Sequence, residues 1–305
     1  MRKTCLNMVY ELAKKDERIV FVGSDLGAGL LEEMKNEMPE RWYMEGVAEQ
    51  NIIGLAAGLA MEGFIPYVNT IATFLTRRCY EQVALDLCLH NLPVRLIGNG
   101  GGLVYAPLGP THLAIEDMAI MRSLPNMTVV APTDADEMTR LMMQTPDVPG
   151  PVYIRLGKGG DPIVSREEDG FEIGKSILLR EGADILMVTT GIMASRALEA
   201  ADILAAQGRD CSVLNMHTVK PLDHARLKEL AAKTKQIVTI EEHTLPGGLG
   251  SAVLESLTDS LYGQVPPVKR LGIPDTFAKD YGSQDSLLES YGLQPKEIAH
   301  TILKN

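Results

Sequence analysis

The chain has 305 residues, which is enough for two domains of ordinary size, each with its own hydrophobic core. Its content of 45% hydrophobic and 23% charged residues is typical of globular proteins and excludes a disordered chain. Asp and Glu number 40 against 29 Lys and Arg, so the formal net charge is -11 and nucleic acid is excluded as an expected partner.

The cysteines and the apolar segments predict a cytoplasmic protein. The four cysteines show neither a C-x-x-C pair nor the spacing of a zinc site, which fits a reducing compartment. No apolar run reaches the roughly 18 residues that a membrane-spanning helix needs. We therefore expect neither export nor membrane insertion, and no metal ligands within this chain.

Strand-like apolar runs alternate with segments of helix length through the first half of the chain. These runs lie at 19–22, 65–69, 94–98, 128–131 and 152–155. Such alternation is typical of a parallel sheet covered by helices, so we predict an α/β domain over 1–160.

The alternation stops at a polar stretch rich in Gly and Pro and then resumes. We predict a linker at 161–172 and a second, smaller α/β domain at 173–305. Its expected elements are strands at 184–190, 211–216 and 236–241, a helix at 195–207, and helices after Asp223 and Gly250. The predicted fold class is therefore α/β, with two open parallel-sheet domains.

An acidic residue, Glu49, precedes a helix of mostly small residues at 52–61. The run Gly-Leu-Ala-Ala-Gly-Leu-Ala at 54–60 has no polar face, so we predict a buried helix. A desolvated carboxylate needs a partner, and a neutral ring nitrogen would suit it. An N-terminal capping acid that needs no ligand is an equally acceptable interpretation of this segment alone.

The loop at 99–112 is the richest candidate for chemistry. It begins Asn-Gly-Gly-Gly and ends Gly-Pro-Thr-His, leading into a helix expected to begin near Leu113. Ligands of open parallel sheets bind beyond the carboxyl ends of the strands, and His112 could present an imidazole there. A capping or surface histidine is the alternative. Since no G-x-G-x-x-G occurs, the glycines do not form a dinucleotide fingerprint.

Six short motifs, taken together, resemble the carboxyl-terminal half of transketolases. They are Gly-Val-Ala-Glu-Gln-Asn at 46–51, Thr-Phe-Leu at 73–75, Gly-Pro-Thr-His at 109–112, Pro-Asn-Met at 125–127, Glu-Glu-His at 241–243 and Gly-Gly-Leu-Gly-Ser-Ala at 247–252. The resemblance covers nearly the whole chain and extends to 1-deoxyxylulose-5-phosphate synthases and to the β subunits of 2-oxo acid dehydrogenases. It implies the pyrimidine-binding and C-terminal domains of a thiamine diphosphate enzyme.

The resemblance also implies roles for individual residues at the cofactor. Glu49 matches the catalytic glutamate that hydrogen-bonds the pyrimidine N1′, and Phe74 matches the aromatic residue that stacks on that ring. Arg77 matches an arginine of the deoxyxylulose synthases, and Tyr80 matches a pocket aromatic of transketolases. A core Phe, a solvated Arg and a packed Tyr are the alternatives.

Further matches concern the substrate. His112 matches a histidine that contacts substrate, and Arg155 falls where transketolases place a phosphate-binding arginine. Two positions depart from the transketolase pattern: Leu108 replaces an acidic residue that contacts a sugar hydroxyl, and Gly100 replaces a histidine. The implied reaction is transfer of a two-carbon ketol unit between a ketose and an aldose, and we expect both sugars to be phosphorylated. Leu108 suggests a less hydroxylated substrate.

The family's Gly-Asp-Gly motif, which marks the Mg²⁺ and diphosphate site, does not occur in this chain. Glu168-Asp169-Gly170 is interpreted as a turn. The resemblance thus implies the C-terminal subunit of a split enzyme, whose partner subunit holds Mg²⁺ and the diphosphate, in a dimer of heterodimers.

Two alternatives stay open. One is a deoxyxylulose phosphate synthase-like or 2-oxo acid decarboxylating enzyme, and the other is a non-catalytic structural or regulatory subunit. In the second domain, His217, Lys220 and His243 could face the cleft, although structural roles are favoured.

Overall fold

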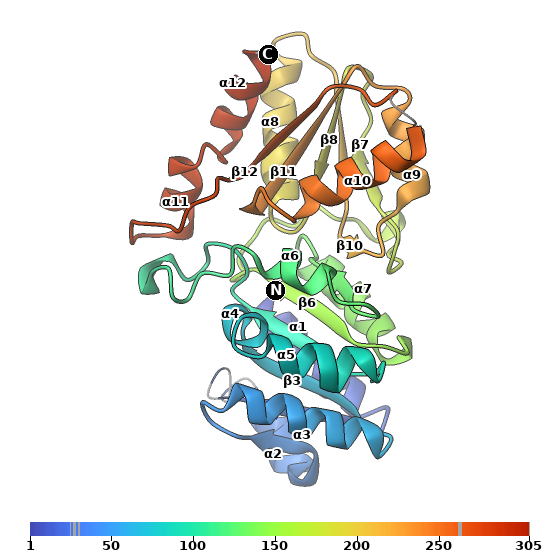
Figure 1. Cartoon of the computed structure of the whole chain (residues 1–305), viewed down its shortest axis with the longest axis vertical. Helices are drawn as coiled ribbons and strands as arrows, with labels where there is room; N and C mark the ends of the chain where they lie inside the picture. Colours follow the sequence, from blue (N-terminus) through green and yellow to red (C-terminus); the bar gives the residue numbers. More distant parts are fainter. Residues whose placement is uncertain (25, 27–28, 30, 262–263, 305) are drawn as a thin grey trace.

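The computed structural model describes residues 1–24, 26, 29, 31–261 and 264–304. Its two α/β parts lie one above the other, with the N-terminus near the junction and the C-terminus at the far end of the second part (Figure 1). The predicted α/β class with two mostly parallel sheets is confirmed.

The helices of the described residues include short 3-10 and π-helical turns, labelled η. The α-helices are α1 (Arg2–Ala13), α2 (Glu32–Glu37), α3 (Glu49–Met61), α4 (Ala72–Thr76), α5 (Tyr80–Gln82), α6 (Asp117–Arg122), α7 (Ala135–Gln144), α8 (Met193–Ala205), α9 (His224–Ala231), α10 (Leu249–Leu261), α11 (Gln284–Ser290) and α12 (Pro295–Leu303). The turns are η2 (Pro39–Arg41), η3 (Val83–Leu89), η4 (Ala106–Leu108), η5 (Thr145–Asp147) and η6 (Glu167–Asp169).

The strands form two sheets. They are β1 (Ile19–Gly23), β2 (Trp42–Met44), β3 (Ile65–Ile71), β4 (Arg95–Asn99), β5 (Thr128–Val130), β6 (Val152–Leu156), β7 (Ile177–Arg180), β8 (Ile185–Thr189), β9 (Cys211–Asn215), β10 (Thr218–Lys220), β11 (Gln236–Thr244) and β12 (Val268–Ile273).

The first sheet has the order β10-β5-β6-β4-β3-β1-β2 within the described chain. Its central strands are mostly apolar and are buried along their whole length, as a parallel sheet between helix layers requires. Alternate residues of these strands contribute to two separate hydrophobic clusters, one under α1 and α7 and the other under α3 and η3. The expectation of an all-parallel sheet is wrong at one edge, because β10 pairs antiparallel with β5.

The second sheet has the order β12-β11-β8-β9-β7, and here β7 is the antiparallel edge strand. Helix α12 packs against α8, and α10 packs against α9 and β11 (Figure 1). The sequence patterns missed β2, β7, β10 and β12. These strands are short, or are only partly buried as edge strands, so they lack the apolar run by which the central strands were found.

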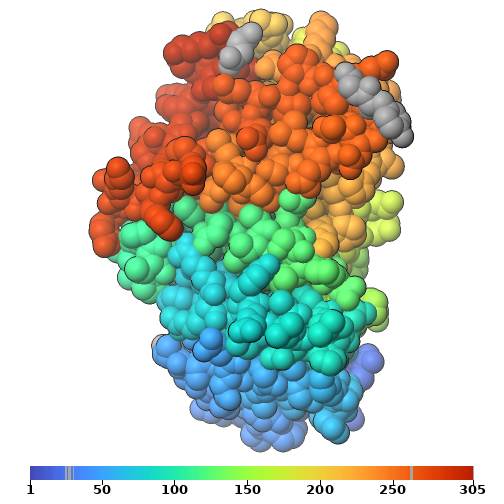
Figure 2. All heavy atoms as spheres, in the orientation of Figure 1, coloured from blue at the N-terminus to red at the C-terminus, as the bar shows by residue number. Residues whose placement is uncertain are grey.

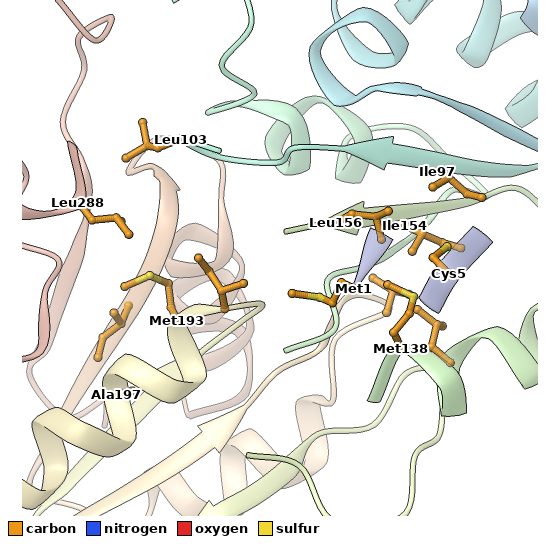
Figure 3. Packing of buried hydrophobic residues seen from close by; sticks show 14 of the residues in the cluster. Met1, Cys5, Ile97, Leu103, Met138, Ile154, Leu156, Met193, Ala197 and Leu288 are labelled. Carbon is orange, nitrogen blue, oxygen red and sulfur yellow. The ribbon is translucent and has the colours of Figure 1, made fainter. Parts of the chain in front are cut away.

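One hydrophobic cluster runs from the first sheet into the second part of the chain. It includes Met1 and Leu156 from the first part with Met193 and Leu288 from the second (Figure 3). Strand β10 comes directly after β9 of the second sheet in the chain, but it pairs with β5 of the first sheet. The two parts therefore share both backbone and side-chain contacts.

Helix α3 is less buried than its small residues predict. Ile52, Ile53 and Ala56 are buried, but Gly54 and Gly58 are exposed in this single chain and Met61 is 57% exposed. The prediction of a buried helix therefore holds for only one side of α3 in the single chain, because the other side faces no other element of the described residues.

Candidate active site

Glu49 is the first residue of α3, directly after the turn that follows β2. Gly46 in this turn has φ +66°, a conformation that glycine adopts without strain. The helix N-cap is Ala48, so Glu49 is not the capping side chain. Its carboxylate is 2% exposed and accepts a hydrogen bond from the Arg78 guanidinium. The structure therefore gives Glu49 a buried position with a cationic partner.

Phe74, in α4 after β3, lies beside this ion pair. The guanidinium carbon of Arg78 is 4.3 Å from the centroid of the Phe74 ring. The Phe74 ring also meets the His112 imidazole edge-on, with centroids 5.3 Å apart and planes at 65°. The structure thus brings Glu49, Phe74 and His112 to one place, and it adds Arg78, which the sequence analysis did not single out.

Arg77 and Tyr80 face helix α6 and do not contact Glu49. Nη2 of Arg77 donates to Glu116 Oε2 over 2.7 Å, and this carboxylate raises the pKa of Arg77. The Tyr80 hydroxyl lies 2.9 Å from the hydroxyl of Ser123. Helix α4 ends at Thr76, and both side chains are held at the two ends of α6.

His112 lies in the turn before α6, and the predicted helix start near Leu113 is wrong. Ala114 exchanges two backbone hydrogen bonds with Gly102, so this segment is extended and α6 begins only at Asp117. Nδ1 of His112 is 2.9 Å from the hydroxyl of Thr111. In Figure 2 the orange-red segment before α11 lies against this green loop, where Tyr281 approaches Gly109.

Arg155 lies apart from the Glu49 cluster, at the end of β6. Its Nε donates to Asp117 over 2.8 Å, and its Nη2 donates to the carbonyls of Ala114 and Glu242. Burial is the largest single influence and disfavours the charged guanidinium, but the carboxylates of Asp117 and Glu242 and the Tyr153 hydroxyl together outweigh it and raise the pKa of Arg155. These contacts join the two parts of the chain, so phosphate binding by Arg155 stays a prediction.

The two histidines considered as candidates in the second part, His217 and His243, are buried. His217 stacks on Phe171 with ring centroids 4.1 Å apart, and burial lowers its pKa to about 3. Nδ1 of His243 donates to the Thr244 carbonyl, while Nε2 accepts from the backbone N–H of Ala119. Burial also lowers the pKa of His243. Both side chains therefore pack as neutral rings away from the Glu49 cluster.

The motif at 247–252 has a structural role. The Glu241 carboxylate accepts the N–H groups of Leu249 and Gly250 over 2.6 and 2.8 Å, at the first turn of α10. A Cβ at Gly248 would lie 2.1 Å from that carboxylate. This glycine lets the strand and helix approach closely enough for the carboxylate to bind the helix N-terminus.

Within the described ranges, no group of three or more His, Cys, Asp or Glu residues is arranged to hold a metal ion. Cys5, Cys79, Cys88 and Cys211 are buried and form no disulfide. The helices that the structure describes include none long and apolar enough to cross a bilayer.

A buried carboxylate next to an aromatic face can bind a flat heteroaromatic ring. The carboxylate would hydrogen-bond a ring nitrogen, and Phe74 would stack on the ring. The hydroxyl of Thr73, the residue before Phe74, is buried and has no hydrogen-bond partner within the described residues. The residue next to Phe74 in the sequence therefore has unused hydrogen-bonding capacity.

Comparisons with known proteins agree with this geometry. Residues 1–160 match the family described as transketolase, pyrimidine binding domain, and residues 174–298 match transketolase, C-terminal domain. The chain is 41% identical over 306 residues to 6-deoxy-6-sulfo-D-fructose transketolase subunit SqwH of Clostridium sp. (strain MSTE9), covering 99% of this chain and 94% of that protein.

Other relatives are longer. The 1-deoxy-D-xylulose-5-phosphate synthase of Caldanaerobacter subterraneus subsp. tengcongensis is 39% identical over 96% of this chain, which spans 47% of that protein. The chain therefore covers about half the length of such synthases. A solved structure described as a split gene transketolase, inactive beta4 tetramer, superposes with a TM-score of 0.91 at 38% identity, covering 99% of this chain and 97% of that one.

Proposed function

Because this chain belongs to the transketolase family, we propose that it is the C-terminal subunit of a split thiamine diphosphate-dependent transketolase. The reaction would transfer a two-carbon ketol unit between a ketose and an aldose. The observation that carries the proposal is the buried Glu49 beside Phe74, since neither packing nor helix capping requires an acid there. The subunit named SqwH, matched over 94% of its length, supports the split arrangement.

The residues present fit the aminopyrimidine of the cofactor. Glu49 would bind the pyrimidine N1′, and Phe74 would stack on the ring. Arg77 and Tyr80, held at the two ends of α6, would close the pocket beyond Phe74. When bound, thiamine diphosphate supplies a nucleophilic thiazolium carbon that its own aminopyrimidine deprotonates.

This chain's residues would manage protons and orientation. Glu49 would share a proton with the pyrimidine N1′ in a hydrogen bond. Burial of Glu49 would strengthen this hydrogen bond by excluding water. His112, in edge contact with Phe74, would contact a substrate oxygen from the loop above the ring. Arg155, which is ion-paired with Asp117, would orient that loop and would bind a substrate phosphate only by releasing a contact.

A partner subunit would hold Mg²⁺ and the diphosphate. The chain has no Gly-Asp-Gly, and its described residues offer no metal-binding group. The exposed side of α3, with Gly54 and Gly58, would pack against another subunit in a dimer of heterodimers. The similar solved structure is described as an inactive tetramer of beta subunits alone, which supports a need for the partner subunit.

The substrate would be less hydroxylated than an ordinary transketolase sugar. Leu108 is 50% exposed at the end of η4, close to the His112 loop. The relative named for 6-deoxy-6-sulfo-D-fructose supports a modified sugar. If Leu108→Asp leaves the preference between hydroxylated and deoxygenated donors unchanged, this part of the proposal is refuted.

A second candidate is synthase-like chemistry with a 2-oxo acid donor. Arg77 and the 39% identity to a deoxyxylulose phosphate synthase favour it. Assaying the assembled enzyme with a ketose phosphate or with pyruvate, each with the same aldose acceptor, separates the two. Product from the ketose alone supports ketol transfer, and product from pyruvate alone supports the synthase-like reaction.

The central experiment replaces Glu49 by Gln, and Glu62, an exposed residue just after the same helix, by Gln as a matched control. The assembled complex would be purified from the native cells by a tag on this chain. We expect Glu49→Gln to assemble normally and to lose about 100- to 10,000-fold in turnover, while the control keeps its activity. Full turnover in Glu49→Gln would refute the role of this residue and favour a non-catalytic subunit.

A further inference from the structure

Arg78 occupies the place that the proposed function gives to the cofactor ring. Its guanidinium lies over the face of Phe74, with the central carbon 4.3 Å from the ring centroid. The same guanidinium donates a hydrogen bond to the buried carboxylate of Glu49. These two contacts, stacking on Phe74 and donation to Glu49, are the ones assigned above to the aminopyrimidine.

A guanidinium is a reasonable substitute for that ring because it is flat, delocalised and carries N–H donors at its edge. It stacks on aromatic faces and binds carboxylates through these donors. Two flat groups cannot occupy the same face of Phe74, so the ring and the guanidinium exclude each other.

We propose that Arg78 is a placeholder that holds the pyrimidine site in the cofactor-free chain and leaves it when thiamine diphosphate binds. The inference rests on the proposed function and adds a residue that controls cofactor affinity. Without the cofactor, Arg78 keeps the buried Glu49 from being an uncompensated charge, which would destabilise the fold.

The position of Arg78 allows this exchange. The residue lies in the turn between α4 and α5, and its side chain is 41% exposed whereas that of Glu49 is 2% exposed. Its backbone carbonyl accepts a hydrogen bond from Gln50 Nε2 over 3.2 Å, which holds the turn on α3 while the side chain has solvent beside it. The movement therefore needs a change of side-chain rotamer and no rearrangement of the helices.

The test measures cofactor binding in the assembled complex, purified through a tag on this chain and freed of cofactor by dialysis against EDTA. Thiamine diphosphate with MgCl₂ would be titrated calorimetrically into the wild type, Arg78→Ala, Arg78→Lys and the control Arg166→Ala, which removes an exposed arginine of the linker. The apparent Kd equals the intrinsic Kd divided by the fraction of open sites.

We expect Arg78→Ala to bind thiamine diphosphate about tenfold more tightly than the wild type. This factor corresponds to a wild-type site that Arg78 occupies in roughly nine molecules out of ten. Arg78→Lys can pair with Glu49 but cannot stack flat on Phe74, so its Kd should lie between those of Arg78→Ala and the wild type. The Kd of Arg166→Ala should equal that of the wild type. Unchanged or weaker binding in Arg78→Ala would overturn the placeholder role. If Arg78→Ala fails to assemble, Arg78→Lys decides by the same criterion.

A second readout needs no binding constant. The rise in melting temperature on adding thiamine diphosphate with MgCl₂ should be larger for Arg78→Ala than for the wild type, because only the cofactor-free state loses a contact. An equal or smaller rise would contradict the proposal. If the wild-type complex binds no thiamine diphosphate at all, the proposed function fails, a result distinct from binding that Arg78 does not control.

Discussion

The buried pair of Asp117 and Arg155 gives a prediction about stability that also tests the predicted role of Arg155. Asp117 is fully buried at the start of α6, and its Oδ2 accepts the Nε of Arg155 over 2.8 Å and the Tyr153 hydroxyl over 2.7 Å. In Asp117→Leu, Arg155 keeps a charge that is 6% exposed and unpaired. Breaking a buried pair in this way costs about 3–5 kcal/mol.

Replacing both partners should recover most of this loss. In Asp117→Leu with Arg155→Met no buried charge remains, and apolar replacements of buried pairs are often close to neutral. The double variant still lacks three hydrogen bonds: the one from the Tyr153 hydroxyl and those to the carbonyls of Ala114 and Glu242. Their loss should lower the free energy of unfolding by about 1–3 kcal/mol. We therefore expect the double variant to be more stable than Asp117→Leu.

The assay is urea unfolding of the purified chain, followed by the fluorescence of Trp42, the one tryptophan of the sequence. The reasoning is refuted if the double variant is no more stable than Asp117→Leu. Turnover of the assembled double variant then separates the two roles of Arg155. Recovered activity indicates a positioning role, whereas a stable but inactive enzyme supports substrate binding.

Two further predictions concern buried carboxylates. Burial raises the pKa of Glu137 to about 7 from the ordinary value of 4.5. Between these two pH values the folded chain therefore holds a proton that the unfolded chain has released. The free energy of unfolding should fall by about 3 kcal/mol as the pH rises from 4.5 to 7. Glu137→Gln should flatten this dependence in urea midpoints measured across that range, and an unchanged slope would contradict it. In Gly102→Ala, a Cβ at φ +68° would lie 2.4 Å from the Glu242 carboxyl carbon, so we expect a loss of about 2–4 kcal/mol. Gly170→Ala, with similar φ and open space, should lose about half as much; equal losses would show that Glu242 moves aside freely.

Local pattern was enough to predict much of the fold. The strands β1, β3, β4, β6 and β8 are mostly apolar and almost entirely buried, so they stand out in the sequence without knowledge of their neighbours. The position of Glu49 at a helix start was also predictable, because the run of small residues after it marks the helix.

Tertiary structure decided which side chains meet. Arg78 lies 29 residues from Glu49, and Arg155 lies 87 residues from the Glu242 carbonyl that it binds. β10 joins a sheet whose other strands come earlier in the chain. Periodicity records only whether a residue faces a core, whereas an ion pair depends on how distant segments pack. The sequence alone therefore determined the central strands of the α/β fold and placed Glu49 at a helix start, and only the packed structure showed that Arg78 pairs with Glu49 and lies over Phe74.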